Sequence, residues 1–504
     1  MLIEKLTFAQ LSLNAFVLVF VSSASRNRST VILLGLDGFR WDYMSKADTP
    51  NMDFIVKTGV KAPFVKSVFP TVTMPNLYTI VTGLYPESHG IIANEMFDPD
   101  FRAIFDSSNN ESRWWNGGEP VWVTNQKQGH KSGTCFWPGY DVEIRGYFPS
   151  FSSNGTRYNK AFVSPYANAM PAKERIDMTI KWLSADDPPT FIALYFLDTD
   201  TAGHRFGPDS PEVKAVIRNF DANVTGYLLD QLRQANLTDE VNLIVTSDHG
   251  MLAYNTSNFV NFDDFINAST YQAWSGNKAF FTIQPLPGKE TYVYESLKKE
   301  QNKTQLFEVY KKEDIPDSLH FKHNRRIGSI VGLMKEGWYI RSSNLPEARQ
   351  PDGVIRGDHG YSNAIKDMNP FFIACGPAFK ENLTSEPFEL TDIYPLICDI
   401  LGIEPSPHNG SLSRVKQLLR EPLPKPTTTD STPGGSTETP TEKKRGNGNK
   451  IVKIAGFTVL GFAAGVCVVA SILLTIRWCN RGNRPRKALV ENDETQGLQA
   501  EEAA

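Results

Sequence analysis

The sequence predicts an α/β protein in which a mostly parallel central sheet is covered by helices on both faces. Four short apolar segments have the length and composition of buried strands: Val31–Leu36, Phe191–Leu197, Val241–Val245 and Phe371–Ala374. Segments with helical patterns lie between them, namely Asn76–Val81, Ala172–Leu183 and Pro211–Ala235. Continuous apolar strands that alternate with helices are typical of a parallel sheet buried on both sides.

The first 25 residues have the layout of a secretory signal peptide (1–25). Lys5 precedes the apolar stretch Leu11–Val21, and small residues follow at Ser22–Ser25. An uncleaved membrane anchor is the alternative, but this apolar stretch is short for a membrane span.

A stalk, a membrane helix and a tail are predicted after one globular region at 29–419. Residues 421–450 are rich in Pro, Thr, Ser and Gly, so they cannot bury a core. A transmembrane helix is predicted at 451–476, because the 23 residues Ile454–Ile476 carry no charge. Basic residues are concentrated after this helix, which favours a cytoplasmic tail at 477–504. We therefore expect a single-pass type I protein of the plasma membrane with an extracellular catalytic domain.

Possible covalent modifications agree with an extracellular location. Ten Asn-X-Ser/Thr sequons indicate a glycosylated surface, at Asn27, Asn110, Asn154, Asn223, Asn236, Asn255, Asn267, Asn302, Asn382 and Asn409. Only three cysteines precede the stalk, so they form at most one disulfide, and Cys375–Cys398 is the candidate pair. The sequence does not decide which sequons carry glycans.

The formal net charge of −4 argues against a basic groove for nucleic acid. An anionic substrate would have to be attracted by bound metals or by a local patch of positive charge.

Aspartate and histidine residues recur at the ends of the predicted strands. They are Asp37, Asp200, His204, Asp248 and His249 after the first three strands, and His359 ahead of the fourth. Each alone has an ordinary alternative, as a turn aspartate, a surface pair or a loop histidine. Ligands bind at the carboxyl ends of parallel strands, so we expect these side chains to meet at one edge. Carboxylate and imidazole together suit zinc.

Thr73 is the candidate nucleophile. It precedes a short helical pattern with Pro75 in the first turn, where proline is favoured. A helix N-terminus presents free N–H groups to a phosphate. The alternative is that Thr73 only caps this helix. A threonine hydroxyl needs a metal or a base to act as a nucleophile, so Thr73 and the metal site would have to act together.

These motifs resemble the ectonucleotide pyrophosphatase/phosphodiesterase family. The nucleophile region of that family is similar to Thr71–Asn76 followed by Thr82–Asn94. Its other motifs are matched in order by Asp37–Arg40, Asp200–Ser210, Thr246–Met251 and Gly357–Tyr361. The resemblance covers about Thr30 to Val415. No Cys-rich somatomedin-like repeat or nuclease-like domain is expected, so the chain looks like the short, C-terminally anchored fourth and fifth members.

The resemblance implies an alkaline-phosphatase-like α/β fold and two zinc ions. It assigns one zinc to Asp200, His204 and His359, and the other to Asp37, Asp248, His249 and the Thr73 hydroxyl. It also implies a nucleotidyl-threonine intermediate on Thr73. Asn94 is expected to donate a hydrogen bond to a phosphoryl oxygen of the substrate.

Four residues are expected to bind the nucleotide part of the substrate. Met74 stands where the family usually has Phe, and Tyr158 matches the opposing aromatic residue. Trp137 and Asp141 match positions near the base and sugar, with core packing as the alternative for Trp137.

The implied activity is that of a zinc-dependent ecto-phosphodiesterase/pyrophosphatase. It would hydrolyse extracellular nucleotides, namely dinucleoside polyphosphates, NAD-like dinucleotides or nucleoside triphosphates, to nucleoside monophosphates. The alternatives are a choline-phosphodiester lipase and a non-catalytic surface receptor or adhesion glycoprotein. A sulfatase is disfavoured, because the Cys/Ser-X-Pro-X-Arg signature is absent around Thr73. The sequence decides neither the oligomeric state nor whether the extracellular part is shed.

Overall fold

The computed structural model describes residues 29–153, 170–343 and 353–421. The predicted signal peptide, Tyr158, the stalk from Pro422 onward, the membrane helix and the tail lie outside these ranges. Within them, no helix is both long and apolar enough to cross a membrane.

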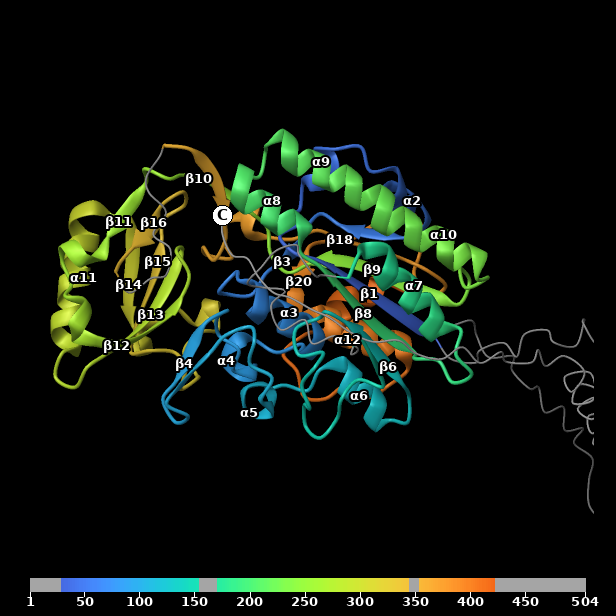
Figure 1. Cartoon of the computed structure of the whole chain (residues 1–504), viewed down its shortest axis with the longest axis horizontal. Helices are drawn as coiled ribbons and strands as arrows, with labels where there is room; N and C mark the ends of the chain where they lie inside the picture. The colour runs from blue at the N-terminus through green and yellow to red at the C-terminus, as the bar shows by residue number, and fades with distance from the viewer. Residues whose placement is uncertain (1–28, 154–169, 344–352, 422–504) are drawn as a thin grey trace, which may run out of the picture. The chain divides into compact units, whose positions relative to one another are not determined.

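An eight-stranded sheet forms the centre of the molecule, in the order β19-β2-β18-β9-β1-β8-β6-β7 (Figure 1). Its middle strands are β1 (Thr30–Leu36), β8 (Phe191–Phe196) and β9 (Val241–Ser247), which pair in parallel as predicted. Every residue of these three strands is buried, which explains their continuous apolar character. Parallel pairing continues through β6 (Ser132–Cys135) to β7 (Phe151–Ser152).

The fourth predicted strand, β18 (Phe372–Cys375), runs antiparallel to β9. The start of β18 therefore lies at the edge where the parallel strands end, with Phe372 opposite Thr246. This orientation explains why His359 comes before its strand, whereas the other candidate ligands follow theirs. Two short strands, β2 (Val60–Ala62) and β19 (Leu383–Thr384), complete this side of the sheet.

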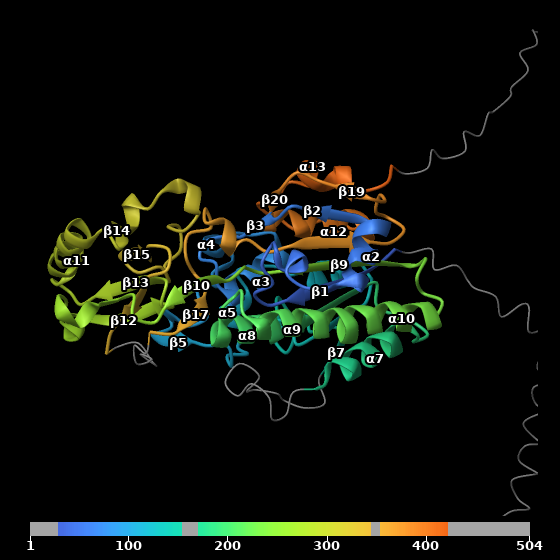
Figure 2. The ribbon, with the colours of Figure 1, turned by 90° about the horizontal axis from the view of Figure 1, so that it is seen from above.

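Helices cover both faces of the sheet, as the sequence predicts (Figures 1 and 2). One layer contains α3 (Thr73–Thr82), α6 (Val121–Lys127) and α12 (Ile393–Leu401). The other contains α2 (Pro50–Thr58), α7 (Ala172–Leu183), α9 (Pro211–Phe220) and α10 (Tyr227–Gln234). The predicted helix Pro211–Ala235 is one continuous rod in which the π-helical turn η2 (Asp221–Gly226) joins α9 to α10.

A second lobe, which no sequence pattern predicts, lies between β9 and β18 along the chain. Its antiparallel sheet has the order β12-β13-β15-β14, formed by β12 (Tyr271–Gly276), β13 (Phe280–Pro285), β14 (Phe307–Lys311) and β15 (Ile330–Met334). Helix α11 (Glu290–Thr304) packs against β14, at the left of Figure 1. The lobe has its own core, which includes Phe262, Phe281, Val293, Leu297 and Ile330.

An antiparallel pair of strands connects the second lobe to the central sheet. The chain enters the lobe along β10 (Leu252–Asn255) and returns along β17 (Ile355–Asp358). His359, at the carboxyl edge of the sheet, is the residue directly after this return strand.

The remaining elements are short. They are β3 (Val65–Lys66), β4 (Met96–Asp98), β5 (Ala103–Phe105), β11 (Phe259–Asn261), β16 (Tyr339–Arg341), β20 (Phe388–Glu389), α4 (Pro86–His89), α5 (Ser112–Trp115), α8 (Asp198–Phe206) and α13 (Leu412–Val415).

The candidate disulfide Cys375–Cys398 was a wrong prediction. Cys135, Cys375 and Cys398 are all free thiols. Cys375 ends β18 and faces a groove lined by α2 and α10, whereas Cys398 belongs to α12, in the layer on the opposite face. The sheet therefore separates the two sulfur atoms.

Candidate metal centre and nucleophile

Three imidazoles converge at the carboxyl edge of the central sheet. His249 follows β9, His204 lies in α8, and His359 follows β17. The Nε2 atoms of His359 and His204 are 3.1 Å apart, and the rings of His249 and His359 stack with centroids 3.7 Å apart.

Backbone carbonyls fix the tautomer of all three histidines. Each Nδ1 lies within hydrogen-bonding distance of a carbonyl oxygen: His204 with Gly357 at 2.9 Å, His249 with Gly250 at 2.8 Å, and His359 with Thr71 at 2.9 Å. A carbonyl only accepts, so each Nδ1 carries the hydrogen and each Nε2 presents its lone pair to the centre. This is the tautomer that binds a metal.

The potential ligand atoms form two groups. In the first, Asp200 Oδ1 lies 3.4 Å from His204 Nε2 and 3.5 Å from His359 Nε2. In the second, His249 Nε2 lies 3.2, 3.3 and 3.4 Å from Thr73 Oγ1, Asp37 Oδ1 and Asp248 Oδ2. Tetrahedral ligands bonded to zinc at about 2.0–2.1 Å are separated from one another by about 3.3 Å. The first group therefore has the spacing of a zinc ligand shell, and in the second Asp37, His249 and the shared Asp200 place their ligand atoms within 4.8 Å of one another.

Three carboxylate oxygens at this centre have no hydrogen-bond partner among the described residues. They are buried and belong to Asp37 (Oδ1), Asp200 (Oδ1) and Asp248 (Oδ2). A buried carboxylate oxygen without a partner is costly, unless a cation binds it. These orphaned oxygens are the clearest sign that the centre holds positive ions.

Two of the aspartates use their second oxygen to bind the protein. The hydroxyl of Tyr195 donates to Asp37 Oδ2. Asp248 Oδ1 accepts from the Gly38 and His249 N–H groups at 3.1 and 2.9 Å, and from the Ser247 hydroxyl at 3.1 Å. These bonds orient the carboxylates so that their other oxygens point to the centre.

Burial perturbs the ionisation of the centre strongly. It raises the pKa of Asp200 to about 7 and that of Asp248 to about 8, and it raises the pKa of Asp37 well above its usual value. Burial also lowers the pKa of His359 well below its usual value, and the neighbouring His249 lowers it further. The protein alone thus disfavours charge here, and bound cations would restore the ionised carboxylates.

Thr73 is the first residue of α3, and its side chain reaches the second group of ligand atoms. It is 4% exposed, so its side chain is buried at the centre. Asn94 accepts the N–H of Met74 through Oδ1 at 2.9 Å. The amide nitrogen of the half-buried Asn94 therefore remains as a donor beside the N-terminus of α3.

The structure separates the other predicted substrate residues. Met74 is 1% exposed and Trp137 is fully buried, and both belong to the main hydrophobic core. Trp137 donates from Nε1 to the Leu77 carbonyl at 3.2 Å, and its ring lies where a Cβ on Gly35 would come within 2.5 Å. Trp137 therefore packs in the core in this structure, and its contact with a nucleotide stays a prediction. Asp141 is half-buried, and burial raises its pKa.

The sequence patterns did not predict two polar residues of the centre. Tyr195 supports Asp37, and Asp358 lies 3.9 Å from His204 Nδ1 and accepts the His359 N–H at 2.9 Å. A hydroxyl-bearing residue inside an otherwise apolar strand was the available signal for Tyr195.

Residues 31–362 match the family model of type I phosphodiesterases/nucleotide pyrophosphatases. The matched span contains all six candidate ligands and Thr73. The chain belongs to this family. Its members are metal-dependent hydrolases of phosphodiester and phosphoanhydride bonds, and the Asp and His groups described above agree with that chemistry.

Individual phosphodiesterase/pyrophosphatase relatives resemble the chain over most of its length. It is 38% identical over 430 residues to ectonucleotide pyrophosphatase/phosphodiesterase family member 5 of Homo sapiens, covering 84% of each chain. It is 40% identical over 397 residues to the Xenopus laevis protein named bis(5'-adenosyl)-triphosphatase enpp4, covering 78% of this chain and 82% of the relative.

A solved structure of the same family confirms the alkaline-phosphatase-like fold. Murine family member 5, an inactive threonine-to-alanine variant in complex with AMP, superposes with a TM-score of 0.71 at 39% identity. The match covers 78% of this chain and 100% of the murine one.

Proposed function

We propose that this phosphodiesterase/pyrophosphatase is a zinc enzyme that hydrolyses extracellular nucleotides to nucleoside monophosphates through a threonine-bound intermediate. One observation carries the proposal: three buried carboxylate oxygens without a hydrogen-bond partner lie at the same centre as three imidazole Nε2 atoms, one of which is 3.2 Å from the hydroxyl of Thr73. A purely structural network would satisfy those oxygens with protein hydrogen bonds.

Two zinc ions would be held by the two groups of ligand atoms. Asp200, His204 and His359 form one site. Asp37, Asp248 and His249 form the other, together with the Thr73 hydroxyl. When bound, such ions lower the pKa of the hydroxyl and neutralise the charge of the phosphoryl oxygens.

Thr73 would act as the nucleophile in the first step. Its Oγ1 attacks phosphorus and gives its proton to solvent, a bond between Oγ1 and phosphorus forms, and the bond from phosphorus to the leaving oxygen breaks. The leaving group departs with the electron pair. The N-terminus of α3 and the amide nitrogen of Asn94 donate to the phosphoryl oxygens where negative charge develops.

Water would complete the reaction. Its oxygen attacks the same phosphorus, the bond from phosphorus to Thr73 Oγ1 breaks, one proton of the water passes to Thr73 Oγ1, and the other is released to solvent. The product is a nucleoside monophosphate, and the chain returns to its starting state.

The relatives support a nucleotide as the substrate. The frog relative is named for the hydrolysis of a dinucleoside triphosphate, and the murine structure contains AMP. We therefore place dinucleoside polyphosphates first among the substrates, ahead of NAD-like dinucleotides and nucleoside triphosphates. Asp141 is proposed to contact the nucleoside, because it matches a position near the sugar in the family and is only half-buried.

The proposed site of action is the outer face of the plasma membrane. The predicted signal peptide, the sequons and the apolar segment 451–476 support this location. The activity should then be measurable on intact cells that express the chain.

The test uses the full-length chain, with chelator-treated and Thr73→Ala samples as controls. We expect it to release nitrophenol from the p-nitrophenyl ester of thymidine monophosphate and AMP from diadenosine triphosphate. Chelation should abolish both activities and Zn²⁺ should restore them. Thr73→Ala should lose at least about 10³-fold in kcat, whereas Thr73→Ser should keep measurable activity.

Two results would contradict the proposal. Turnover of lysophosphatidylcholine, with release of choline or phosphocholine, and no nucleotide turnover would favour the lipase alternative. A zinc-loaded chain that turns over none of these substrates would favour a receptor or adhesion protein.

A further inference from the structure

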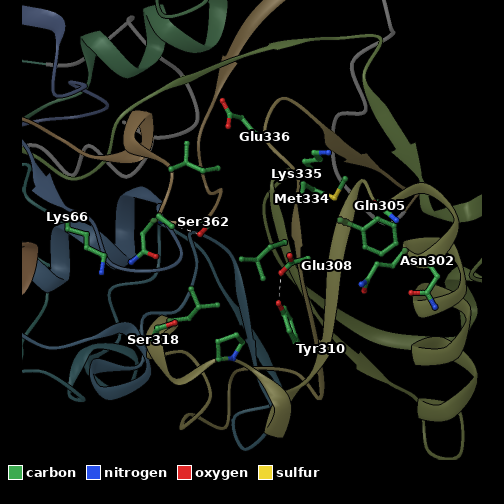
Figure 3. Close-up of a pocket in the computed structure, with 18 residues that line it drawn as sticks. Lys66, Asn302, Gln305, Glu308, Tyr310, Ser318, Met334, Lys335, Glu336 and Ser362 are labelled. Carbon is green, nitrogen blue, oxygen red and sulfur yellow. Dashed lines mark hydrogen bonds between the residues drawn. The ribbon is translucent and has the colours of Figure 1, made fainter.

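A cavity of about 900 Å³ lies outside the metal centre, between the second lobe and the domain of the central sheet (Figure 3). The second lobe contributes residues of α11, β14 and β15, and the central domain contributes Lys66 and the segment Ser362–Ile365. Neither Thr73 nor any of the six candidate metal ligands lines it. Its volume is in the range of about 300–1,000 Å³ found for small-molecule sites.

The lining suits a neutral, polar ligand with an apolar face. Buried side chains of Phe307, Leu333 and Met334 form an apolar part of the wall. Amides and hydroxyls surround it, from Gln301, Gln305, Asn363, Ser318 and Ser362. A pyranose ring presents hydroxyl groups at its edge and C–H groups on its faces, so it complements such a wall.

Charges in the cavity balance. The lining contains two lysines and two glutamates, namely Lys66, Lys335, Glu308 and Glu336. Glu308 also accepts the hydroxyl of Tyr310, and Lys66 lies 3.6 Å from a carboxylate oxygen of Glu389. An ionic ligand therefore finds no excess of opposite charge here, which favours an uncharged occupant.

A sugar can be attached covalently at this position. Asn302 lines the cavity and begins the sequon Asn302-Lys303-Thr304 in the last turn of α11. Its side chain is exposed, so an oligosaccharide can reach it. The helix ends at Thr304, and Gln305 adopts the left-handed conformation (φ 55°) that turns the chain into β14.

We infer that Asn302 carries an N-linked glycan whose first sugars occupy this cavity and join the second lobe to the central domain. The glycan comes from a lipid-diphosphate-linked oligosaccharide. The bond from Asn302 Nδ2 to the sugar carbon forms, the bond from that carbon to the diphosphate breaks, and Nδ2 loses one proton. The inference requires entry into the secretory pathway, which the signal peptide and the other sequons predict.

The glycan links the second lobe to a functional part of the chain. Ser362–Ile365, which forms the opposite wall, begins only three residues after His359. Sugars held between α11 and this segment restrict movement of the lobe relative to the metal centre.

The first test compares two sequons in the full-length chain from a secretory host. Asn110 is the matched control, because it is exposed and does not line the cavity. Glycopeptide mass spectrometry should find glycans on both residues. Under native conditions, an amidase that removes N-glycans should release the Asn302 glycan at least about tenfold more slowly, because the sugars must first leave the cavity.

The second test uses a matched pair at position 304. Thr304→Ala destroys the sequon, whereas Thr304→Ser retains it at the same helical position. Thr304→Ala should lower Tm by several degrees, and Thr304→Ser and Asn110→Gln should match the wild type. An unmodified Asn302, a glycan released as fast as that of Asn110, or an unchanged Tm in Thr304→Ala would overturn the inference.

Discussion

Chelation of the metals is expected to destabilise the protein more at pH 8 than at pH 5. Burial raises the pKa of Asp200 to about 7 and that of Asp248 to about 8 in the metal-free fold. The same groups titrate near pH 4 in an unfolded chain. The metal-free fold thus binds more protons than the unfolded chain between about pH 4 and pH 8. Its stability is greatest below this window and falls as the pH rises through it.

The size of this loss of stability follows from the raised pKa of Asp200, whose side chain is 16% exposed. In this window, each pH unit lowers the free energy of unfolding by about 1.4 kcal/mol for each such group. Asp200 alone therefore lowers it by about 3 kcal/mol between pH 5 and the pKa of Asp200 in the folded state. Asp248 adds to this loss. For a domain of about 390 residues, 3 kcal/mol corresponds to about 4 °C in Tm. With zinc bound, the carboxylates are ionised and paired, so the loss disappears.

The measurement is thermal unfolding of the full-length chain with Zn²⁺ or with chelator at pH 5 and pH 8. The difference in Tm between the two samples should be larger at pH 8 by at least about 4 °C. A difference that is constant, or that shrinks at pH 8, would refute the reasoning.

Asp248→Asn provides the control. Its amide oxygen can still accept from Gly38 and His249, while the buried charge is gone. The chelated variant should be more stable than the chelated wild type at pH 8 and equal to it at pH 5. It should also gain much less stability from Zn²⁺.

Three further substitutions test individual contacts. Tyr195→Phe removes the hydroxyl that donates to Asp37, and should weaken zinc binding about 10- to 100-fold in a chelator competition. Gly38→Ala places a Cβ 2.9 Å from the Asp200 backbone at φ 63°, and should lower both Tm and zinc content. Asn94→Asp keeps the oxygen that accepts the helix N–H but loses the donor to phosphate. It should lower kcat about 10²- to 10³-fold with Tm and zinc content unchanged.

The central sheet and its edge could be predicted because the signals are local. Asp37, Asp200 and Asp248 follow buried apolar strands, and parallel pairing brings the ends of such strands together. The direction of β18 depends instead on the path of the chain through the second lobe, which no local pattern encodes. For this reason, only the structure explains why His359 precedes its strand.

Features that depend on distant partners could not be predicted. Trp137 is buried because Gly35, far away in the sequence, leaves room for its ring. The second lobe has no boundary in composition, and its strands β13 and β15 are short apolar segments like those of the central sheet, so no local pattern assigns them to a separate sheet. Both depend on packing that forms only in the complete fold.

The path of the chain through the second lobe has a consequence for folding. Asp200 and His204 lie in α8, whereas His359 arrives only after the chain has passed through the whole lobe. An ion bound by all three closes a loop of about 155 residues, and the entropy of such a closure corresponds to roughly 4 kcal/mol. A bound zinc would therefore act as a cross-link, whereas the three cysteines of the described residues form none. This cross-link would form only after His359 has been synthesised and has folded into place. His359 follows the first of the three ligands by more than a hundred residues.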